Sequence, residues 1–280
     1  MLRWLGSFLP GAGWHVELRP ASVSLAPAGA SVRTRAQALQ TIAVNGEAAE
    51  ANDVSESWRA PSQALSEALR ERGARLGRVD IVLSDHFVRY LLIPWSPGLV
   101  SDKERLSFAR LAFKELYGDA ADSWELCLDE QPAGEGSFAC AVDRALVASL
   151  RDGVARAGGR LHSLVPALAD RINRYRVALK APQFCFVAAE PGRVSLAFRS
   201  KGAWRAVRSR RINEELAQAL PVLLKQEAVV GDAVGGGVLY LCPDAMPAPF
   251  PVAGWQPVRL GEGTRSRRSR SDGHVATVGS

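Results

Sequence analysis

The sequence predicts an α/β protein with two lobes, and two patterns carry this prediction. An order of strand, turn, strand, strand, helix and strand near the N-terminus begins again after Lys180-Ala181-Pro182. Between the two copies, a compact β-β-α-β unit interrupts the first lobe and differs from the regular alternation of a dinucleotide-binding domain. A chain of 280 residues with 47% hydrophobic residues can bury a sizeable core without disulfides.

The elements of the first lobe follow from hydrophobic spacing and from turn residues. Before the interruption we expect strands at 14–18, 22–26 and 41–44, a helix at 61–72, and strands at 79–84 and 87–95. Asp85-His86 separates the last two strands and reads as a turn element. Its alternative role is as part of a catalytic site completed by a serine or cysteine elsewhere in the chain.

The helix that follows has the clearest start signal in the chain. Ser101 and Glu104 have the spacing of a capping box, in which each side chain bonds the backbone of the other residue. The helix should run to about Tyr117 and stop at Gly118. Four apolar residues are expected on its inward face, namely Leu106, Ala109, Phe113 and Leu116.

The remaining elements complete the first lobe and build the second. We expect strands at 124–130, 137–142 and 160–164 with helices at 143–157 and 166–175, then strands at 184–189, 194–199 and 203–210, a helix through Leu216, Leu220, Leu223 and Leu224, and strands at 237–241 and 258–260. The predicted organisation is an N-terminal amphipathic segment at 1–13, a first lobe at 14–180 with an inserted unit at about 85–165, a second lobe at 181–262 and a basic tail at 263–280.

The two ends of the chain differ from the body in composition. Trp4, Leu5 and Phe8 lie at near-helical spacing beside an arginine, so this segment is a candidate for contact with a membrane surface or a partner; the alternative is that it folds back on its own domain. No apolar run approaches about 20 residues and no signal peptide is recognisable, so we expect a cytoplasmic protein.

Net charge and cysteine usage narrow the functional classes. The formal net charge is +6. The Ser/Arg/Gly-rich tail supplies about half of it, and we expect this tail to be a disordered, solubilising end. No nucleic acid partner is expected, although contact of the tail with acidic lipid, protein or nucleic acid remains the alternative. Four dispersed cysteines without a CxxC pair predict buried, reduced thiols at Cys127, Cys140, Cys185 and Cys242.

Known catalytic signatures are missing from the sequence. Gly235-Gly236-Gly237 is not followed by Lys-Ser/Thr, so it is not a phosphate-binding loop, and no GxSxG or HExxH motif occurs. The four histidines have no partners at metal-ligand spacing. We therefore assign no catalytic, cofactor-binding or metal-binding residue, and we expect no cofactor.

Several segments together resemble a known family. They are Val79–Ser84, Arg89–Trp95 with the helix after it, Cys140–Asp143, Ala157–Gly159 and Phe186–Leu196. Over about residues 14–260 the chain resembles the actin-like ATPase superfamily, with its ribonuclease H-like lobes. Within it the chain is similar to the PilM type IV pilus assembly proteins and to the cytoplasmic part of the type II secretion L component.

This resemblance implies where nucleotide would bind and why we do not expect it to. In nucleotide-binding members each lobe opens with a hairpin carrying Asp-x-Gly, which orients Mg²⁺ and phosphate. Here the first hairpin has Glu17 before Arg19-Pro20, the second has Glu190-Pro191, and Leu241–Asp244 replaces the adenine-side glycines. The expected protein is not an enzyme but a pseudo-ATPase. The alternative is a working ATPase in which Glu17 or Glu190 holds a metal.

The resemblance also implies a partner. We expect a scaffold at the bacterial inner membrane that binds the cytoplasmic tail of a bitopic assembly protein, with the cytoplasmic motor ATPase of the machine as a further candidate partner. The inserted unit, together with the crevice between it and the first lobe, would form the binding surface. Phe87, Tyr90 and Trp95 are the candidate anchors, because aromatic residues carry much of the energy of small interfaces. Their alternative role is in the core.

Overall fold

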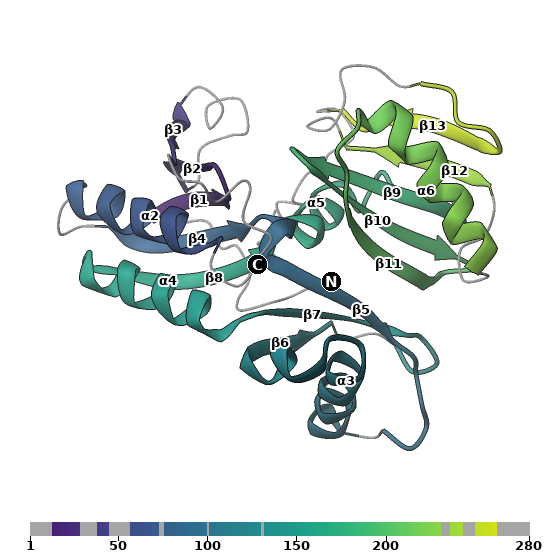
Figure 1. The fold of residues 1–280 in the computed structure, drawn as a ribbon, viewed down its shortest axis with the longest axis horizontal. Coiled ribbons are helices and arrows are strands. Elements are labelled where there is room, and N and C mark those ends of the chain that lie inside the picture. The colour runs from purple at the N-terminus through teal and green to yellow at the C-terminus, as the bar shows by residue number, and fades with distance from the viewer. Residues whose placement is uncertain are drawn as a thin grey trace, which may run out of the picture.

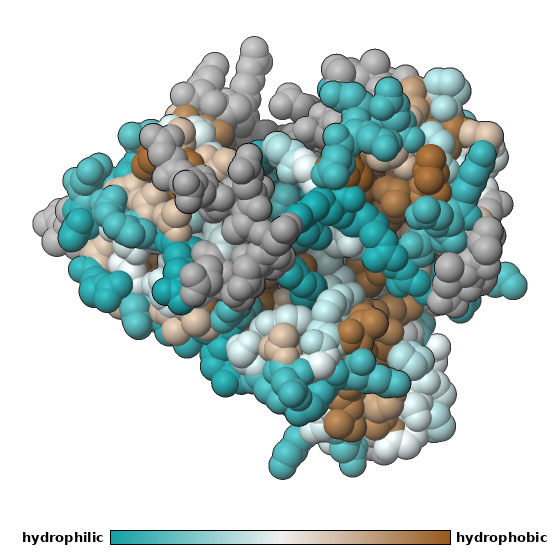
Figure 2. Space-filling view, in the orientation of Figure 1, coloured by the Kyte–Doolittle hydropathy of each residue, from teal (hydrophilic) through white to brown (hydrophobic). Residues whose placement is uncertain are grey.

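The computed structural model describes residues 13–28, 38–44, 57–72, 76–99, 101–129, 132–230, 236–242 and 250–261. Two five-stranded sheets with their helices form two lobes, and a smaller three-stranded sheet lies below them in Figure 1. Figure 2 shows the surface of the molecule in the same orientation. The predicted contacts of Trp4, Leu5 and Phe8 and the predicted basic tail fall outside the described residues. Among the described helices, none is long and apolar enough to span a membrane.

The first lobe is built on a mixed sheet with the order β3-β2-β1-β4-β8. Its strands are β1 (Gly13–Arg19), β2 (Ser22–Pro27), β3 (Gln40–Ala43), β4 (Gly77–Leu83) and β8 (Gly159–Pro166). Helices α2 (Arg59–Glu71) and α4 (Arg144–Arg156) cover one face. On that face Val16, Leu18 and Ile81 pack with Leu65 and Leu146, because alternate residues of a strand point to the same side.

The second lobe repeats this plan. Its sheet has the order β11-β10-β9-β12-β13, and its strands are β9 (Gln183–Glu190), β10 (Arg193–Ser200), β11 (Ala203–Arg211), β12 (Gly237–Leu241) and β13 (Trp255–Arg259). In both lobes the first strand pairs antiparallel with the second and parallel with the fourth. The predicted duplication is therefore confirmed in space as well as in sequence.

Two helices complete the second lobe, and one of them is shared. Helix α6 (Leu216–Val230) packs on one face of the sheet through Leu220 and Leu224. Helix α5 (Ala167–Tyr175) lies between the lobes in Figure 1 and contributes Ile172 and Tyr175 to the core on the other face. Because α5 directly follows β8, one short helix connects the two sheets both in sequence and in packing.

The inserted unit has the order strand, helix, strand, strand. It consists of strand β5 (Val88–Ile93), helix α3 (Asp102–Tyr117), the short helix η3 (Gly118–Ser123) and strands β6 (Trp124–Leu128) and β7 (Ser137–Asp143). Its three strands form a sheet with the order β5-β7-β6. Strand β4 belongs to the first-lobe sheet, and α4 and β8 also pack in that lobe. The part of the insertion that has its own sheet, from β5 to β7, is thus shorter than the predicted stretch of about 85–165.

Helix α3 begins and ends as its sequence predicts, but fewer of its residues are buried than predicted. The Ser101–Glu104 capping box is present and Gly118 ends the helix with a φ of 67°. Ala109 and Phe113 are buried, whereas Leu116 is 61% exposed, so its predicted inward position is wrong. In the last turn Tyr117 packs against the ring of Trp124, with centroids 5.2 Å apart, and Leu116 faces solvent.

Candidate functional site

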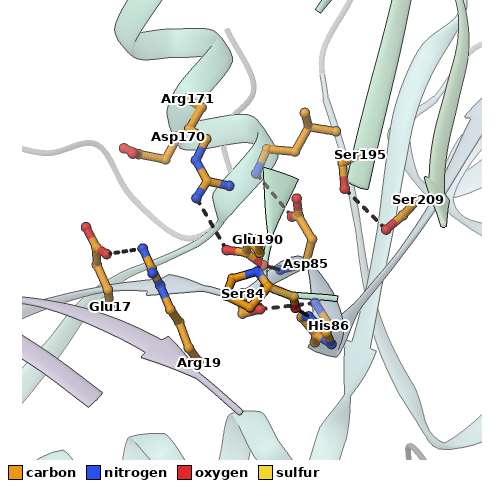
Figure 3. Close-up of polar contacts among 12 residues, drawn as sticks. Glu17, Arg19, Ser84, Asp85, His86, Asp170, Arg171, Glu190, Ser195 and Ser209 are labelled. Carbon is orange, nitrogen blue, oxygen red and sulfur yellow. Dashed lines mark hydrogen bonds and ion pairs between the residues drawn. The ribbon is translucent and has the colours of Figure 1, made fainter. Parts of the chain in front are cut away.

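A narrow cleft with a free volume of about 20 Å³ lies between the two lobes, where the first strand of each sheet ends. Strands β1, β4 and β9 and helix α5 line it. Its polar residues are Glu17, Arg19, Ser84, Asp170, Arg171, Arg174 and Glu190. Figure 3 shows how these side chains reach from both lobes toward one another. The cleft is the natural place to look for a ligand, because both hairpins meet there.

Glu190 is the residue that joins the lobes. It ends β9 and is 8% exposed. Its Oε2 accepts hydrogen bonds from Ser84 Oγ at 2.6 Å and from the Asp85 backbone N–H at 2.9 Å. Its Oε1 lies 3.4 Å from Nη2 of Arg171 in α5. Both oxygens of this carboxylate are therefore engaged by the first lobe and by the shared helix.

The segment after β4 is shaped to receive this carboxylate. Asp85–Phe87 forms a short 3₁₀ helix (η2) instead of a simple turn, and the Ser84 side chain caps it by accepting from the His86 backbone N–H. Free N–H groups at such a helix start carry partial positive charge. Glu190 supplies the acceptor from the other lobe. On the rim, His86 Nε2 lies 3.0 Å from the Pro191 carbonyl oxygen.

Asp85 is a second buried acid beside the cleft and is also satisfied internally. It is 1% exposed, and its Oδ1 accepts from the Tyr90 hydroxyl at 2.6 Å and from the Leu168 N–H at 3.1 Å. Burial, together with the nearby Glu190 charge, raises the pKa of Asp85, while Arg171 and the two hydrogen bonds oppose that shift. Asp85 thus ties β5 and α5 to the end of β4.

On the opposite wall, the first hairpin presents an acid paired within its own strand. Glu17 Oε2 accepts from Arg19 Nη2 at 2.9 Å, and His15 Nε2 lies 3.9 Å from Oε1. These interactions with His15 and Arg19 lower the pKa of Glu17 to about 2, although burial opposes the shift. Glu17 is therefore a carboxylate that is already neutralised by a neighbouring guanidinium.

The chemistry open to this cleft is limited by these contacts. A metal-assisted phosphate site needs carboxylate oxygens free to bind Mg²⁺ directly or through water. Here both oxygens of Glu190 and Oε2 of Glu17 already accept from protein donors, and Arg19 and Arg171 line the cleft beside them. The described residues contain no group of three His, Cys, Asp or Glu side chains placed to hold a metal ion.

The three predicted anchor residues lie in different environments. Phe87 is 6% exposed and packs in the first-lobe core. Tyr90 is half-buried between two cores, and its hydroxyl is held by Asp85. Trp95 is 45% exposed, beyond the end of β5. The structure brings Phe87 and Tyr90 to the base of the inserted unit but does not bring Trp95 into contact with them.

A small apolar cavity of about 20 Å³ lies beside Tyr90, where the inserted unit meets α5. Cys127 and Cys140, opposite each other on β6 and β7, line it with Phe138, Leu168 and Ile172. All four cysteines are free thiols. Burial raises the pKa of Cys127 to about 12 and also raises the pKa of Cys140, so these thiols are unreactive apolar groups at neutral pH.

Sequence reasoning missed two residues of the cleft. Ser84 was placed inside a strand, yet a serine directly before Asp85-His86 has the position of a cap. Arg171 stands on the buried side of α5, at the spacing i, i+4 from Ala167 and Tyr175. An arginine on an otherwise apolar helix face is a usable signal, because a buried charge needs a partner.

No family model and no curated protein matches this sequence, but solved structures do. The cytoplasmic domain of EpsL, an inner membrane component of the type II secretion system of Vibrio cholerae, matches with a TM-score of 0.53 and 13% identity, covering 89% of this chain and 91% of that chain. A Bacteroides thetaiotaomicron protein of unknown function with an actin-like ATPase fold gives 0.53 and 10%, covering 82% and 81%.

A PilM–PilN type IV pilus biogenesis complex matches with a TM-score of 0.50 and 17% identity, covering 84% of this chain and 82% of that chain. At these identities the likeness concerns the fold. The chain has a two-lobed actin-like fold, as its sequence pattern predicts.

Proposed function

We propose that this protein of actin-like fold is a non-enzymatic scaffold of a bacterial type IV pilus or type II secretion-like assembly. It would work on the cytoplasmic side of the inner membrane, as a peripheral component, and bind the cytoplasmic tail of a membrane-anchored partner. The motor ATPase of the same machine is a further candidate partner. The fold shared with EpsL and PilM supports the class of assembly.

One observation carries the non-enzymatic part of the proposal. The interlobe cleft is closed by the protein's own charges, because Glu190 of the second lobe binds Ser84, the Asp85 N–H and Arg171. In a nucleotide-binding protein these donors would face phosphate. A buried carboxylate in the same place repels an anion and would have to be displaced, together with its bonds, before a phosphate could bind.

The apolar cavity beneath Tyr90 supports the binding part of the proposal. It lies in the crevice between the inserted unit and α5, which is the surface predicted to take the partner. Its walls are apolar but its free volume is only about 20 Å³, so an aliphatic side chain of a peptide would enter as the inserted unit and α5 move apart. The PilM–PilN complex shows that a protein of this fold can work as one half of a pair.

The test identifies the partner and then measures its binding to a variant in which the cavity is obstructed. The full-length chain is purified with its partner from solubilised membranes, and a synthetic peptide of the partner's cytoplasmic tail is titrated against it. Ala169→Trp obstructs this cavity and should lower the affinity for the peptide by at least about tenfold, equivalent to about 1.4 kcal/mol. Val222→Trp, on the exposed side of α6, is the matched control and should bind normally.

If the wild type and Ala169→Trp bind the peptide with equal affinity, the partner binds outside this cavity. Recovery of no bitopic membrane protein with the wild-type chain would contradict the scaffold proposal itself.

A working ATPase is the second candidate, and one observation favours it: an acidic residue remains at each hairpin, Glu17 and Glu190. Calorimetry with ATP and Mg²⁺ distinguishes the two functions. The scaffold proposal expects no binding heat at micromolar protein. Micromolar binding that is abolished by Glu17→Gln or Glu190→Gln would instead establish a nucleotide site.

A further inference from the structure

Three arginines from different strands meet where the second lobe touches the inserted unit. Arg193 begins β10 and Arg211 ends β11, and they are direct partners in the antiparallel register. Side chains at such paired positions point to the same face with Cβ atoms about 5 Å apart, and like charges there are destabilising.

Arg89 brings the third charge from the inserted unit. Its strand β5 packs against β11. Burial and the charge of Arg211 lower the pKa of Arg89, and burial with the charges of Arg89 and Arg211 lowers that of Arg193. Arg89 and Arg193 are therefore partly desolvated, and each lies within electrostatic reach of the exposed Arg211. We call Arg89, Arg193 and Arg211 the arginine cluster.

No carboxylate within the described ranges forms an ion pair with a member of the arginine cluster. Arg171, Arg174 and Arg208, in contrast, each have a carboxylate partner. The charges of Asp85 and Glu190 act on Arg193 and balance the cluster in part, but Asp85 Oδ1 and both oxygens of Glu190 already bond other donors.

Arg193 also has an unused donor. Its Nη1 donates to Ser209 Oγ at 3.1 Å, whereas its Nε is buried and has no hydrogen-bond partner among the described residues. Ser209 in turn bonds Ser195 Oγ at 3.2 Å, which Figure 3 shows beside the lobe junction. A buried N–H without an acceptor costs about 1–3 kcal/mol, so an acceptor from outside the chain would be favourable here.

We propose that the arginine cluster is a binding site for a phosphate group. A phosphate carries up to two negative charges on several oxygens and accepts the forked N–H pairs of guanidinium groups. It would relieve the repulsion between paired Arg193 and Arg211 and satisfy the buried Nε. A single carboxylate balances only one of the three charges. The site is separate from the interlobe cleft, which none of these arginines lines.

A phosphate group has two sources, a soluble phosphate and the headgroup of an acidic phospholipid. The inference does not depend on the scaffold proposal, since it rests on charge and register alone. The lipid source would place this junction against a membrane, and the soluble source would make it a ligand site.

The experiment titrates pyrophosphate into the full-length chain at constant ionic strength and follows binding by calorimetry and melting temperature. Arg211→Gln is the test variant, because Arg211 is exposed and its loss should not disturb folding. Arg205→Gln, an exposed arginine on the same strand, is the matched control. We expect pyrophosphate to bind the wild type and Arg205→Gln alike, and Arg211→Gln at least about tenfold more weakly.

A second arm measures co-sedimentation with vesicles of phosphatidylglycerol or of phosphatidylcholine. Binding to phosphatidylglycerol alone that is lost in Arg211→Gln identifies a lipid source, and pyrophosphate binding without vesicle binding identifies a soluble one. If neither binds, or if Arg205→Gln and Arg211→Gln lose binding equally, the proposal is wrong.

Discussion

At the scale of single residues, the interlobe cleft is explained by where each buried charge finds its partner. Glu190 accepts hydrogen bonds from Ser84 and from the Asp85 N–H, and Arg171 balances its charge from α5. Glu17 is balanced by Arg19 on its own strand. The two acids that sequence reasoning kept as candidate metal ligands therefore act, in this structure, as bonds within the protein.

The Glu190 bonds should contribute measurably to stability. Glu190→Ala removes the acceptor of Ser84 and of the Asp85 N–H and leaves Arg171 without its buried counter-charge. Breaking one side of a buried pair typically costs about 3 kcal/mol. Urea unfolding measures this, with Glu214→Ala at an exposed position as the control. A loss no larger than that of the control would show that the lobes are held together by other contacts.

Glu17 should make stability depend on acid pH. Its pKa in the folded protein, about 2, lies below its ordinary 4.5, so the folded state favours the carboxylate. Its contribution is complete above pH 4.5 and is lost as the pH falls toward 2. Glu17→Gln should thus be less stable than the wild type at pH 7, by up to about 3 kcal/mol, and equal to it near pH 2.

Urea unfolding at several pH values tests this directly. A stability difference between the wild type and Glu17→Gln that stays constant from pH 7 to pH 3 would contradict the assignment.

At the scale of elements, local signals set where helices begin and end, whereas contacts with a sheet decide which face is buried. The Ser101–Glu104 box and Gly118 delimit α3 as predicted. Only Ala109 and Phe113 of α3 are fully buried against Leu126 and Ala139 of the small sheet, whereas Leu106 packs against the same core while partly buried. Periodicity alone cannot distinguish an apolar residue that meets a sheet from one that extends past it.

Substitution along α3 separates these two kinds of apolar residue. Phe113→Ala empties the centre of the small core and should cost about 3 kcal/mol. Leu116→Ala removes a side chain that is 61% exposed and should change the free energy of unfolding by less than about 0.5 kcal/mol. Thermal or urea unfolding of both variants compares them. Similar losses for the two would mean that Leu116 is buried in solution.

At the scale of the whole molecule, duplication and insertion account for the architecture. Two sheets of the same strand order face each other across α5, and Glu190, His86 and Pro191 connect the second hairpin to the end of β4. A cleft closed by such direct bonds has no need of a ligand to bring its lobes together.

The closed cleft predicts a molecule whose shape does not respond to nucleotide. The radius of gyration from small-angle scattering should be the same with and without ATP and Mg²⁺, because neither changes the contacts of Glu190. Glu190→Ala serves as a sensitivity control, since release of the hairpin should increase the radius or its spread. Compaction of the wild type on adding ATP and Mg²⁺ would support the ATPase alternative instead.

The sequence by itself determined the local order of strands and helices, the duplicated plan and the absence of known phosphate-binding motifs, because each depends on short-range spacing. Only the tertiary structure decided how these parts act together. It brought Ser84, Arg171 and Glu190 into one bonded group, and it packed β5, which carries Arg89, against β11, where Arg211 pairs with Arg193. The hydrogen bond between Ser84 and Glu190 joins residues 106 positions apart. The energies of these contacts depend on how deeply the side chains are buried and on the geometry of their bonds, and a local sequence pattern predicts neither.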